Sequence, residues 1–145
     1  MSQETKQVIV IRKDLRTKNG QKLPMGKEGA QIAHAAMAFL GRQFESHLAA
    51  RPFKKDRNVP TYITIPVHEA EASWFVNSYR KVVVVANDEA ELLEIYEKAK
   101  AAGLEAHLIT DSGYTCFEEP THTCVGIGPD FADRIDPITG HLKLR

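Results

Sequence analysis

The stretch KVVVVANDEAELLEIYEKAKAAGLEAHLIT, residues 81–110, decides the fold class of this chain. It opens with a continuous run of β-branched residues, which is typical of a strand covered on both faces. A helix follows, since Asp88 and Glu91 have the spacing of a capping box and Gly103 provides a C-terminal stop. Residues 105–110 return to a strand pattern. A strand, a helix and a strand in this order predict a parallel pair of strands joined by a right-handed crossover.

The rest of the chain extends this pattern in both directions. The predicted elements are strands over 6–12 and 121–128, helices over about 26–50 and 69–80, and a helical turn that starts at Pro129. Residues 61–66 could form an extra strand. The sequence therefore predicts one α/β domain over residues 1–145, in which a small mixed sheet of about four strands carries helices on both faces.

The composition is that of an ordinary globular protein, because 43% of the 145 residues are hydrophobic and 26% are charged. No apolar run approaches the length that crosses a bilayer, so no membrane partner is expected. The polar start MSQETKQ has the pattern of neither a signal peptide nor a transit peptide, which favours a cytoplasmic location. Cys116 and Cys124 are too few for a disulfide framework and are expected to be free thiols.

Charge is divided unequally along the chain, although the net charge is zero. Residues 1–60 contain 12 Lys and Arg against 5 Asp and Glu, whereas residues 61–145 contain 7 against 14. Within residues 12–27, six cations accompany a single acid, Asp14. A chain polarised in this way can present a basic face to an anionic partner. The alternative is a solvated face whose charges are balanced in space by the acidic half.

The helix predicted over about 26–50 carries a row of polar residues beside its apolar stripe. The stripe consists of Ala30, Ala33, Met37, Leu40, Phe44 and Leu48. Lys27, Gln31 and His34 share one side of the helix that flanks this stripe, and the row begins at the helix N-terminus, which favours anions. Such a row indicates the rim of a cleft. The alternative is a solvated lysine, a glutamine that caps a neighbouring loop and a histidine at the boundary of the core.

A second candidate for chemistry is Asp111, which follows the strand predicted over 105–110 and precedes a glycine-containing turn. Ligands of open α/β sheets bind beyond the carboxyl ends of the strands, so a carboxylate at this position is a candidate for function. Its alternative role is to accept hydrogen bonds from the backbone of its own turn.

Other kinds of site find little support in the sequence. A phosphate loop is excluded, because five residues separate Gly20 from Gly26 and Glu28 follows the lysine. Cys116, His122 and Cys124 match no standard zinc spacing, so no metal site is expected. No G-x-S-x-G motif supports a serine nucleophile.

Five segments of the chain resemble the type II peptidyl-tRNA hydrolases, the class typical of archaea and eukaryotes. They are VIRKDL (10–15), MGKEGAQIAHAA (25–36), KVVVVANDEAEL (81–92), GLEAHLITDSGYT (103–115) and CVGIGPDFADRIDPITGHLKL (124–144). Their order and internal spacing agree with the family pattern. The resemblance implies a small mixed α/β sheet flanked by helices, a homodimer, and an activity without metal or cofactor.

The resemblance also implies which residues act. It assigns Lys27, His34, Asp111 and Thr115 to catalysis and Gln31 and Thr123 to substrate binding. The basic stretch 12–27 adds Arg12, Lys13 and Arg16 to the expected substrate-binding residues. Lys27 is expected to bind a tRNA phosphate or the oxyanion, and Thr115 and Thr123 to position the acyl group. Asp111 and His34 are expected to orient or deprotonate the attacking water, and either of them could be the base.

The expected function is hydrolysis of the ester bond between peptide and tRNA in peptidyl-tRNA, which recycles tRNA. Two alternatives stay open: a non-catalytic binding or regulatory protein on the same fold, and a hydrolase of another aminoacyl or peptidyl ester. Residues of about 50–68 have the character of an insertion relative to the family, and the loop over 16–24 is longer than the family's. Both are expected near the cleft, where they could alter the choice of substrate.

Overall fold

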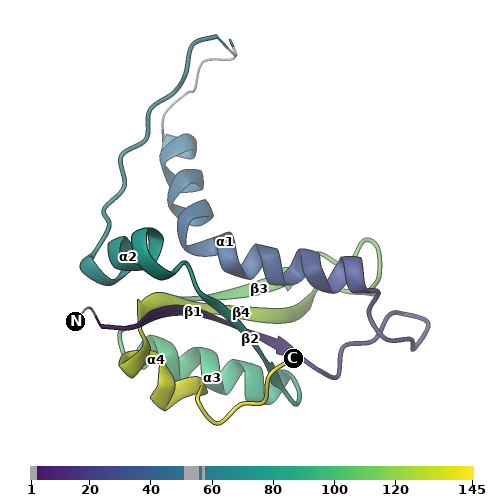
Figure 1. Cartoon of the computed structure of the whole chain (residues 1–145). Helices are drawn as coiled ribbons and strands as arrows, with labels where there is room; N and C mark the ends of the chain where they lie inside the picture. The colour runs from purple at the N-terminus through teal and green to yellow at the C-terminus, as the bar shows by residue number, and fades with distance from the viewer. Residues whose placement is uncertain (1–2, 51–55, 57) are drawn as a thin grey trace.

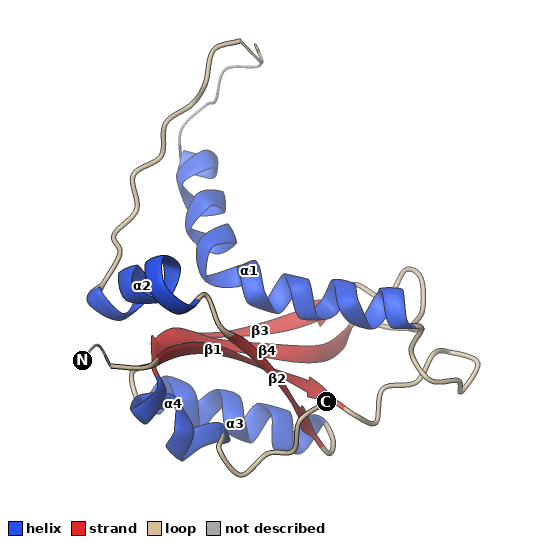
Figure 2. Cartoon of the chain, in the orientation of Figure 1, coloured by secondary structure: helices blue, strands red, loops and turns tan. Residues whose placement is uncertain are grey.

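A mixed sheet of four strands, in the order β2-β1-β4-β3, organises the chain (Figures 1 and 2). β1 (Thr5–Arg12) pairs in parallel with β2 (Lys81–Ala86) and antiparallel with β4 (Thr121–Phe131). β3 (Ala106–Asp111) forms the other edge and pairs antiparallel with β4. The computed structural model describes residues 3–50, 56 and 58–145. The predicted α/β class and the mixed sheet of about four strands are confirmed.

The crossover through α3 (Glu89–Ala101) joins the two edges of the sheet and not two neighbouring strands. β2 and β3 run in the same direction, but β1 and β4 lie between them, so the prediction that they pair with each other is wrong. The central positions go to the strands with the most buried residues, and Ile9 and Val125 in these strands are fully buried. A strand in the middle of a sheet is covered on both faces and needs such a composition.

Helices cover both faces of the sheet (Figure 2). α1 (Met25–Ala50), α2 (Glu69–Ser73) and the π-helix η1 (Trp74–Ser78) lie on one face, and α3 and α4 (Ala132–Thr139) lie on the other. β1 contributes to both cores, since Ile9 and Ile11 pack with α1 while alternate residues pack with α3 and α4. This alternation follows from the two-residue period of a strand.

The buried face of α1 differs from the predicted apolar stripe. Its buried residues are Gln31, Ala35, Ala38 and Phe39. Met37, in contrast, is 65% exposed, and Ala30 and Ala33 also face outward. The reason is the close approach of α1 to β4 at Gly126, where only small side chains fit between helix and sheet. Met37, Phe44 and Leu48 are therefore exposed, whereas Phe39 is the one large apolar side chain that α1 buries among these residues.

Three further details differ from the predicted elements. The helix expected over 69–80 is α2 continued by η1, and Tyr79 ends it in the left-handed region with φ of 50°. Residues 61–66 form no strand, because the sheet offers them no neighbouring strand. Pro129 does not start a helix, since β4 continues to Phe131, where its last residues pair with the first residues of β1.

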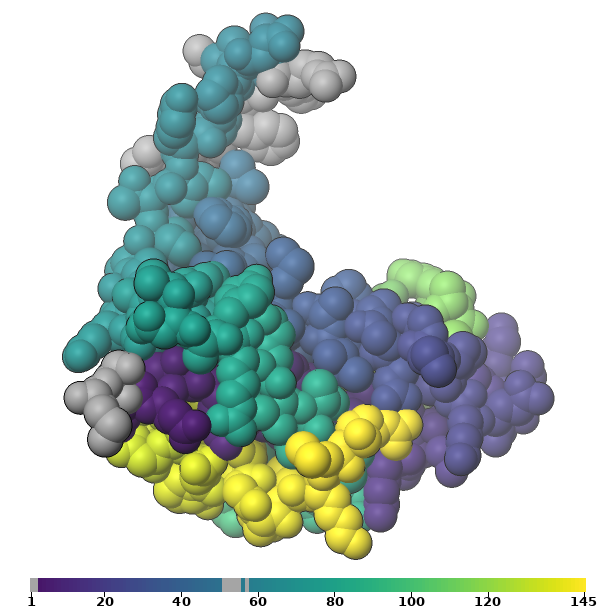
Figure 3. All heavy atoms as spheres, viewed as in Figure 1, coloured from purple at the N-terminus to yellow at the C-terminus, as the bar shows by residue number. Residues whose placement is uncertain are grey.

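An arm stands clear of the domain (Figures 1 and 3). It consists of the second half of α1 and the segment 58–68, which contains no helix or strand. His47 and Leu48 line a hollow of about 220 Å³ together with residues 61–64. The insertion predicted at about 50–68 falls on this arm, and its residues 51–55 and 57 lie outside the described residues. No helix in the described part of the chain is long and apolar enough to span a bilayer.

Candidate active site

The first turns of α1 face the carboxyl end of β3, and a chain of hydrogen bonds joins them. Lys27 Nζ donates to Asp111 Oδ2 at 2.6 Å and to Thr115 Oγ1 at 3.1 Å. Gln31 Nε2 donates to the same Asp111 oxygen at 3.0 Å. Thr123 Oγ1, on the central strand β4, donates to Gln31 Oε1 at 2.6 Å. Five of the predicted site residues, from two strands, a helix and a loop, are thus brought together.

The second oxygen of Asp111 braces the turn that follows β3. Asp111 Oδ1 accepts a hydrogen bond from the backbone N–H of Gly113 at 2.9 Å. Gly113 has φ of +86°, and a Cβ at this position would lie 2.5 Å from the backbone carbon of Glu119. The turn therefore requires glycine. One oxygen of Asp111 holds the turn, as its alternative role predicted, while the other oxygen accepts from Lys27.

Burial and hydrogen bonding act in opposite directions on the Asp111 carboxylate. The residue is only 9% exposed, and burial disfavours its charged form. Hydrogen bonds from Lys27, Gly113 and Gln31 and the charge of Lys27 outweigh burial, so the pKa of Asp111 lies below its usual value. Asp111 is therefore a carboxylate at neutral pH, and its pairing with a lysine side chain that is 21% exposed creates a fixed charged pair at the surface.

Gln31 and Thr123 lie beneath this pair and not at an open rim. Gln31 is 1% exposed and Thr123 is 0% exposed. The hydroxyl of Thr123 satisfies the amide oxygen of Gln31, which leaves the amide N–H groups directed at Asp111. The two residues therefore fix the orientation of the carboxylate from inside the core. The sequence predicts Gln31 at the edge of the buried face of α1. This prediction is wrong because the observed buried face of the helix is rotated relative to the predicted apolar stripe.

His34 is placed differently from the other members of the predicted catalytic set. It is exposed on α1, and no hydrogen bond or ion pair joins its ring to another residue of the described ranges. It lies one turn beyond Gln31 on the helix. The imidazole is therefore near the charged pair in sequence and free to meet a molecule that approaches from solvent.

The three predicted basic residues of the loop after β1 have unequal surroundings. Arg12 binds both oxygens of Asp14 at 2.9 and 3.0 Å and also approaches Glu89 at 3.3 Å. The hydrogen bonds that Arg12 donates to Asp14 raise the pKa of Arg12, so this guanidinium is largely engaged within the protein. Lys13 and Arg16 are exposed.

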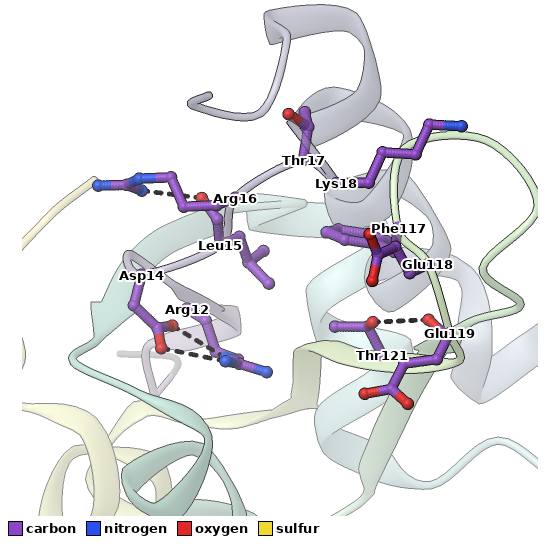
Figure 4. Close-up of a pocket in the computed structure, with 10 residues that line it drawn as sticks. All are labelled: Arg12, Asp14, Leu15, Arg16, Thr17, Lys18, Phe117, Glu118, Glu119 and Thr121. Atoms are coloured by element: carbon purple, nitrogen blue, oxygen red, sulfur yellow. Dashed lines mark hydrogen bonds and ion pairs between the residues drawn. The ribbon is translucent and has the colours of Figure 1, made fainter. Parts of the chain in front are cut away.

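Two hollows lie beside the loop that follows β1. The first, of about 300 Å³, lies between the loop and residues 117–121, and Arg12 and Asp14 face each other in it (Figure 4). The second, of about 280 Å³, is mainly basic. Its charged residues are Arg12, Lys13, Arg16, Lys22, Glu28 and Arg145. Neither hollow is lined by Lys27 or Asp111.

Cys124 and His122 pack within the sheet and its neighbouring side chains. Cys124 is fully buried, and burial raises the pKa of its thiol to about 12. His122 Nδ1 lies 2.9 Å from the hydroxyl of Thr110 on the neighbouring strand. Among the residues that the structure describes, no group of three or more His, Cys, Asp or Glu could hold a metal ion.

Comparison with known proteins links this geometry to one family. The family described as "Peptidyl-tRNA hydrolase PTH2" matches residues 5–145. The peptidyl-tRNA hydrolase of Methanopyrus kandleri is 40% identical over 139 residues, which cover 96% of this chain and 97% of that protein. The peptidyl-tRNA hydrolase of Methanocaldococcus jannaschii is 39% identical over 139 residues, with 96% and 98% covered. The protein named "Peptidyl-tRNA hydrolase 2, mitochondrial" of Bos taurus is 37% identical over 143 residues, with 99% and 65% covered.

Proposed function

Because this chain belongs to the peptidyl-tRNA hydrolase PTH2 family, we propose that it hydrolyses the ester bond of peptidyl-tRNA at the surface where Lys27 meets Asp111. The observation that carries this placement is the 2.6 Å pair between a partly exposed ammonium and a nearly buried carboxylate. Hydrolysis of the bond between the peptide and the terminal ribose makes the enzyme a carboxylic ester hydrolase that returns tRNA to translation.

Lys27 has the geometry of an oxyanion ligand. The reaction passes through a tetrahedral intermediate whose negative oxygen needs a preorganised donor. An ammonium group has three N–H donors, and Asp111 and Thr115 engage two of those of Lys27. The third is available to the carbonyl oxygen of the ester or to a phosphate beside it. Asp111 and Thr115 hold the ammonium in place, so little reorganisation is needed when the charge develops.

Asp111 is better suited to orienting groups than to accepting a proton. A general base works best when its pKa is near the working pH, and the pKa of Asp111 is lowered. His34 lies on α1, one turn beyond Gln31, and its imidazole is exposed to solvent. In this mechanism His34 accepts the proton of the attacking water, and Asp111 orients both the Lys27 ammonium and the water. Thr115 positions the acyl group, and the buried Gln31 and Thr123 keep Asp111 aligned.

The tRNA lies across the basic loop after β1. Lys13 and Arg16 are exposed beside the second hollow and are placed to contact backbone phosphates, while Arg12 shapes the hollow through Asp14. Phosphate contacts dominate the affinity of proteins for nucleic acids. The described part of the arm, which consists of the second half of α1 and residues 58–68, adds surface that the tRNA can contact (Figure 3).

The enzyme acts as a homodimer in the cytoplasm. Met37, Phe44 and Leu48 form an exposed apolar row along α1, and Met37 is 65% exposed. A second copy that covers this row would remove it from water. The similarity to peptidyl-tRNA hydrolases of archaea supports the cytoplasmic location.

The test is release of peptide from purified peptidyl-tRNA by the parent and by Lys27→Ala. Lys98→Ala is the matched control, because Lys98 pairs with Glu94 on the exposed side of α3. Lys27→Ala should lower turnover by about a hundredfold in a protein that stays folded but melts at a somewhat lower temperature, because Asp111 loses its charged partner. Lys98→Ala should retain parental turnover. A parent protein that binds peptidyl-tRNA and leaves the ester intact would establish the non-catalytic alternative. If Lys27→Ala has the same turnover as the parent, the Lys27–Asp111 pair is not the site of the reaction.

A further inference from the structure

The first turn of α1 buries no apolar side chain, and an apolar contact beside it comes only from the partly buried Leu23 that precedes the helix. Met25 is 90% exposed, and nothing lies within 4 Å of the Cβ positions of Gly26 and Gly29. The first buried side chain of the helix is Gln31, which lies more than a turn after Lys27. Apolar packing therefore fixes the middle of α1 but not the turn that carries Lys27, and polar contacts must set the direction of this side chain.

Two ion pairs hold this turn from different sides. Lys27 binds Asp111 on the side of β3. Glu28, the next residue, accepts two hydrogen bonds from Arg145, from Nε at 2.6 Å and from Nη2 at 2.8 Å. Successive residues of a helix point about 100° apart, so the two pairs act in different directions. A bidentate arginine–carboxylate pair fixes orientation as well as distance.

Arg145 can serve as an anchor because its own backbone is attached to the sheet. Its N–H donates to the carbonyl oxygen of Val83 at 3.0 Å, and the N–H of Val85 donates to Lys143 at 2.9 Å. Leu144 forms a bridge with Val84 on the edge strand β2. The guanidinium therefore extends from the edge of the sheet to the first turn of α1. The pair is partly protected, since the side chain of Glu28 is 17% exposed.

We infer that Arg145 is a positioning residue for the hydrolysis reaction, which it serves by holding Glu28 and thereby the turn of α1 that directs Lys27 toward Asp111 and the ester. The inference rests on the proposed function of Lys27. It explains why a charged pair joins two residues 117 positions apart in sequence at a turn that buries no apolar side chain.

The test compares Arg145→Ala, Arg145→Lys, Glu28→Gln and the double variant Glu28→Gln/Arg145→Ala. Each single variant that breaks the pair should lower kcat by about tenfold with a nearly unchanged KM, since misplacement of a catalytic group acts on chemistry. Arg145→Lys should retain part of the lost rate. The double variant should be no slower than the slower single variant, because both substitutions remove the same contact. Lys98→Ala is the control for loss of a cation.

A second measurement needs no activity. Titration of the Asp111 carboxyl carbon by NMR should show a higher pKa in Arg145→Ala than in the parent, because Lys27 is held less well against the carboxylate. An unchanged Asp111 titration overturns the inference, whether or not the parent cleaves peptidyl-tRNA. A rise in KM with unchanged kcat also overturns it and indicates that Arg145 contacts the tRNA itself. A loss of kcat that only follows a lower melting temperature reduces the pair to a structural role.

Discussion

Gly126 of β4 lies directly against Ala35 of α1. A Cβ at residue 126 would stand 2.2 Å from the carbonyl oxygen of Ala35, well inside contact distance. The helix that carries Lys27 and Gln31 is thus seated on a strand that carries Thr123, three residues before the contact. The spacing between helix and sheet therefore sets whether the Thr123–Gln31–Asp111 chain can close.

Gly126→Ala should separate α1 from the sheet and affect stability and activity together. Overpacking of a tight core contact costs about 1–3 kcal/mol or more, and the free energy of unfolding from urea denaturation measures this cost. Turnover should fall as well, because Gln31 moves away from Asp111. Gly41→Ala is the control, since nothing lies within 4 Å of that Cβ position in the same helix. Equal stability of the two variants would show that the contact relaxes freely.

The rotation of α1 is the part of the fold that the sequence could not predict. A helix rich in alanine can bury several of its faces at similar cost, so Met37 and Phe44 indicated the wrong face. Which face of α1 is buried depends on its contact with Gly126, about ninety residues away in the sequence. The residues of α1 alone do not indicate such a long-range contact. The strands over 6–12 and 81–86 were predictable because their continuous β-branched runs fit only a buried strand.

Part of the candidate site could also be predicted from the sequence, and part of it could not. Asp111 could be found because a carboxylate at the end of a strand has a defined place in an open sheet. The contact of Glu28 with Arg145 could not be found, since it depends on how the last residues lie along β2. The burial of Gln31 followed from the rotation of α1 and was missed with it.

Thr123→Val should weaken both the core and the reaction. Valine keeps the shape of threonine but leaves Gln31 Oε1 buried without its 2.6 Å donor. An unsatisfied buried acceptor costs about 1–3 kcal/mol. Turnover should also decline, because the Gln31 amide becomes free to rotate away from Asp111. Thr121→Val is the control, since it removes a hydroxyl that bonds only to an exposed carbonyl of the loop. If Thr123→Val cleaves at the parental rate, Thr123 contributes to the packing of the core and not to the reaction.

Met37→Asp should shift the protein from dimer to monomer. Met37 is 65% exposed in the middle of the apolar row of α1, and a second copy placed there would have to bury the new carboxylate. Sedimentation at several protein concentrations measures the change. Ala90→Asp, at an exposed position of α3, should leave the assembly as it is in the parent. A parent that sediments as a monomer throughout would refute the proposed homodimer.

Acid should destabilise the parent partly through Asp111. The pKa of this carboxyl is lowered in the folded state, so its contribution to stability is present above its ordinary value of 3.8 and is lost as the pH falls toward the folded pKa. Between about pH 5 and pH 3, the free energy of unfolding should decrease more in the parent than in Asp111→Asn. Urea denaturation at both pH values provides the comparison. An equal decrease in both proteins would mean that Lys27 and Gly113 do not favour the charged form.

Asp111→Asn should abolish most of the chemistry while tRNA binding survives. In the parent, one oxygen of the Asp111 carboxylate accepts a hydrogen bond from Gly113, and the other accepts hydrogen bonds from Lys27 and Gln31. An asparagine has a single acceptor oxygen, so either the turn or Lys27 loses its partner and meets an N–H₂ group instead. If asparagine keeps the turn, Lys27 loses its orientation, and single-turnover cleavage should fall by about a hundredfold. Affinity for tRNA should be unchanged or slightly higher, because a negative charge near the phosphates is removed. Cleavage and equilibrium affinity should be measured on the same preparation, since a misfolded protein would lose both. Parental cleavage by this variant would show that Asp111 only braces its turn, and the catalytic role would then pass to His34 and Lys27 alone.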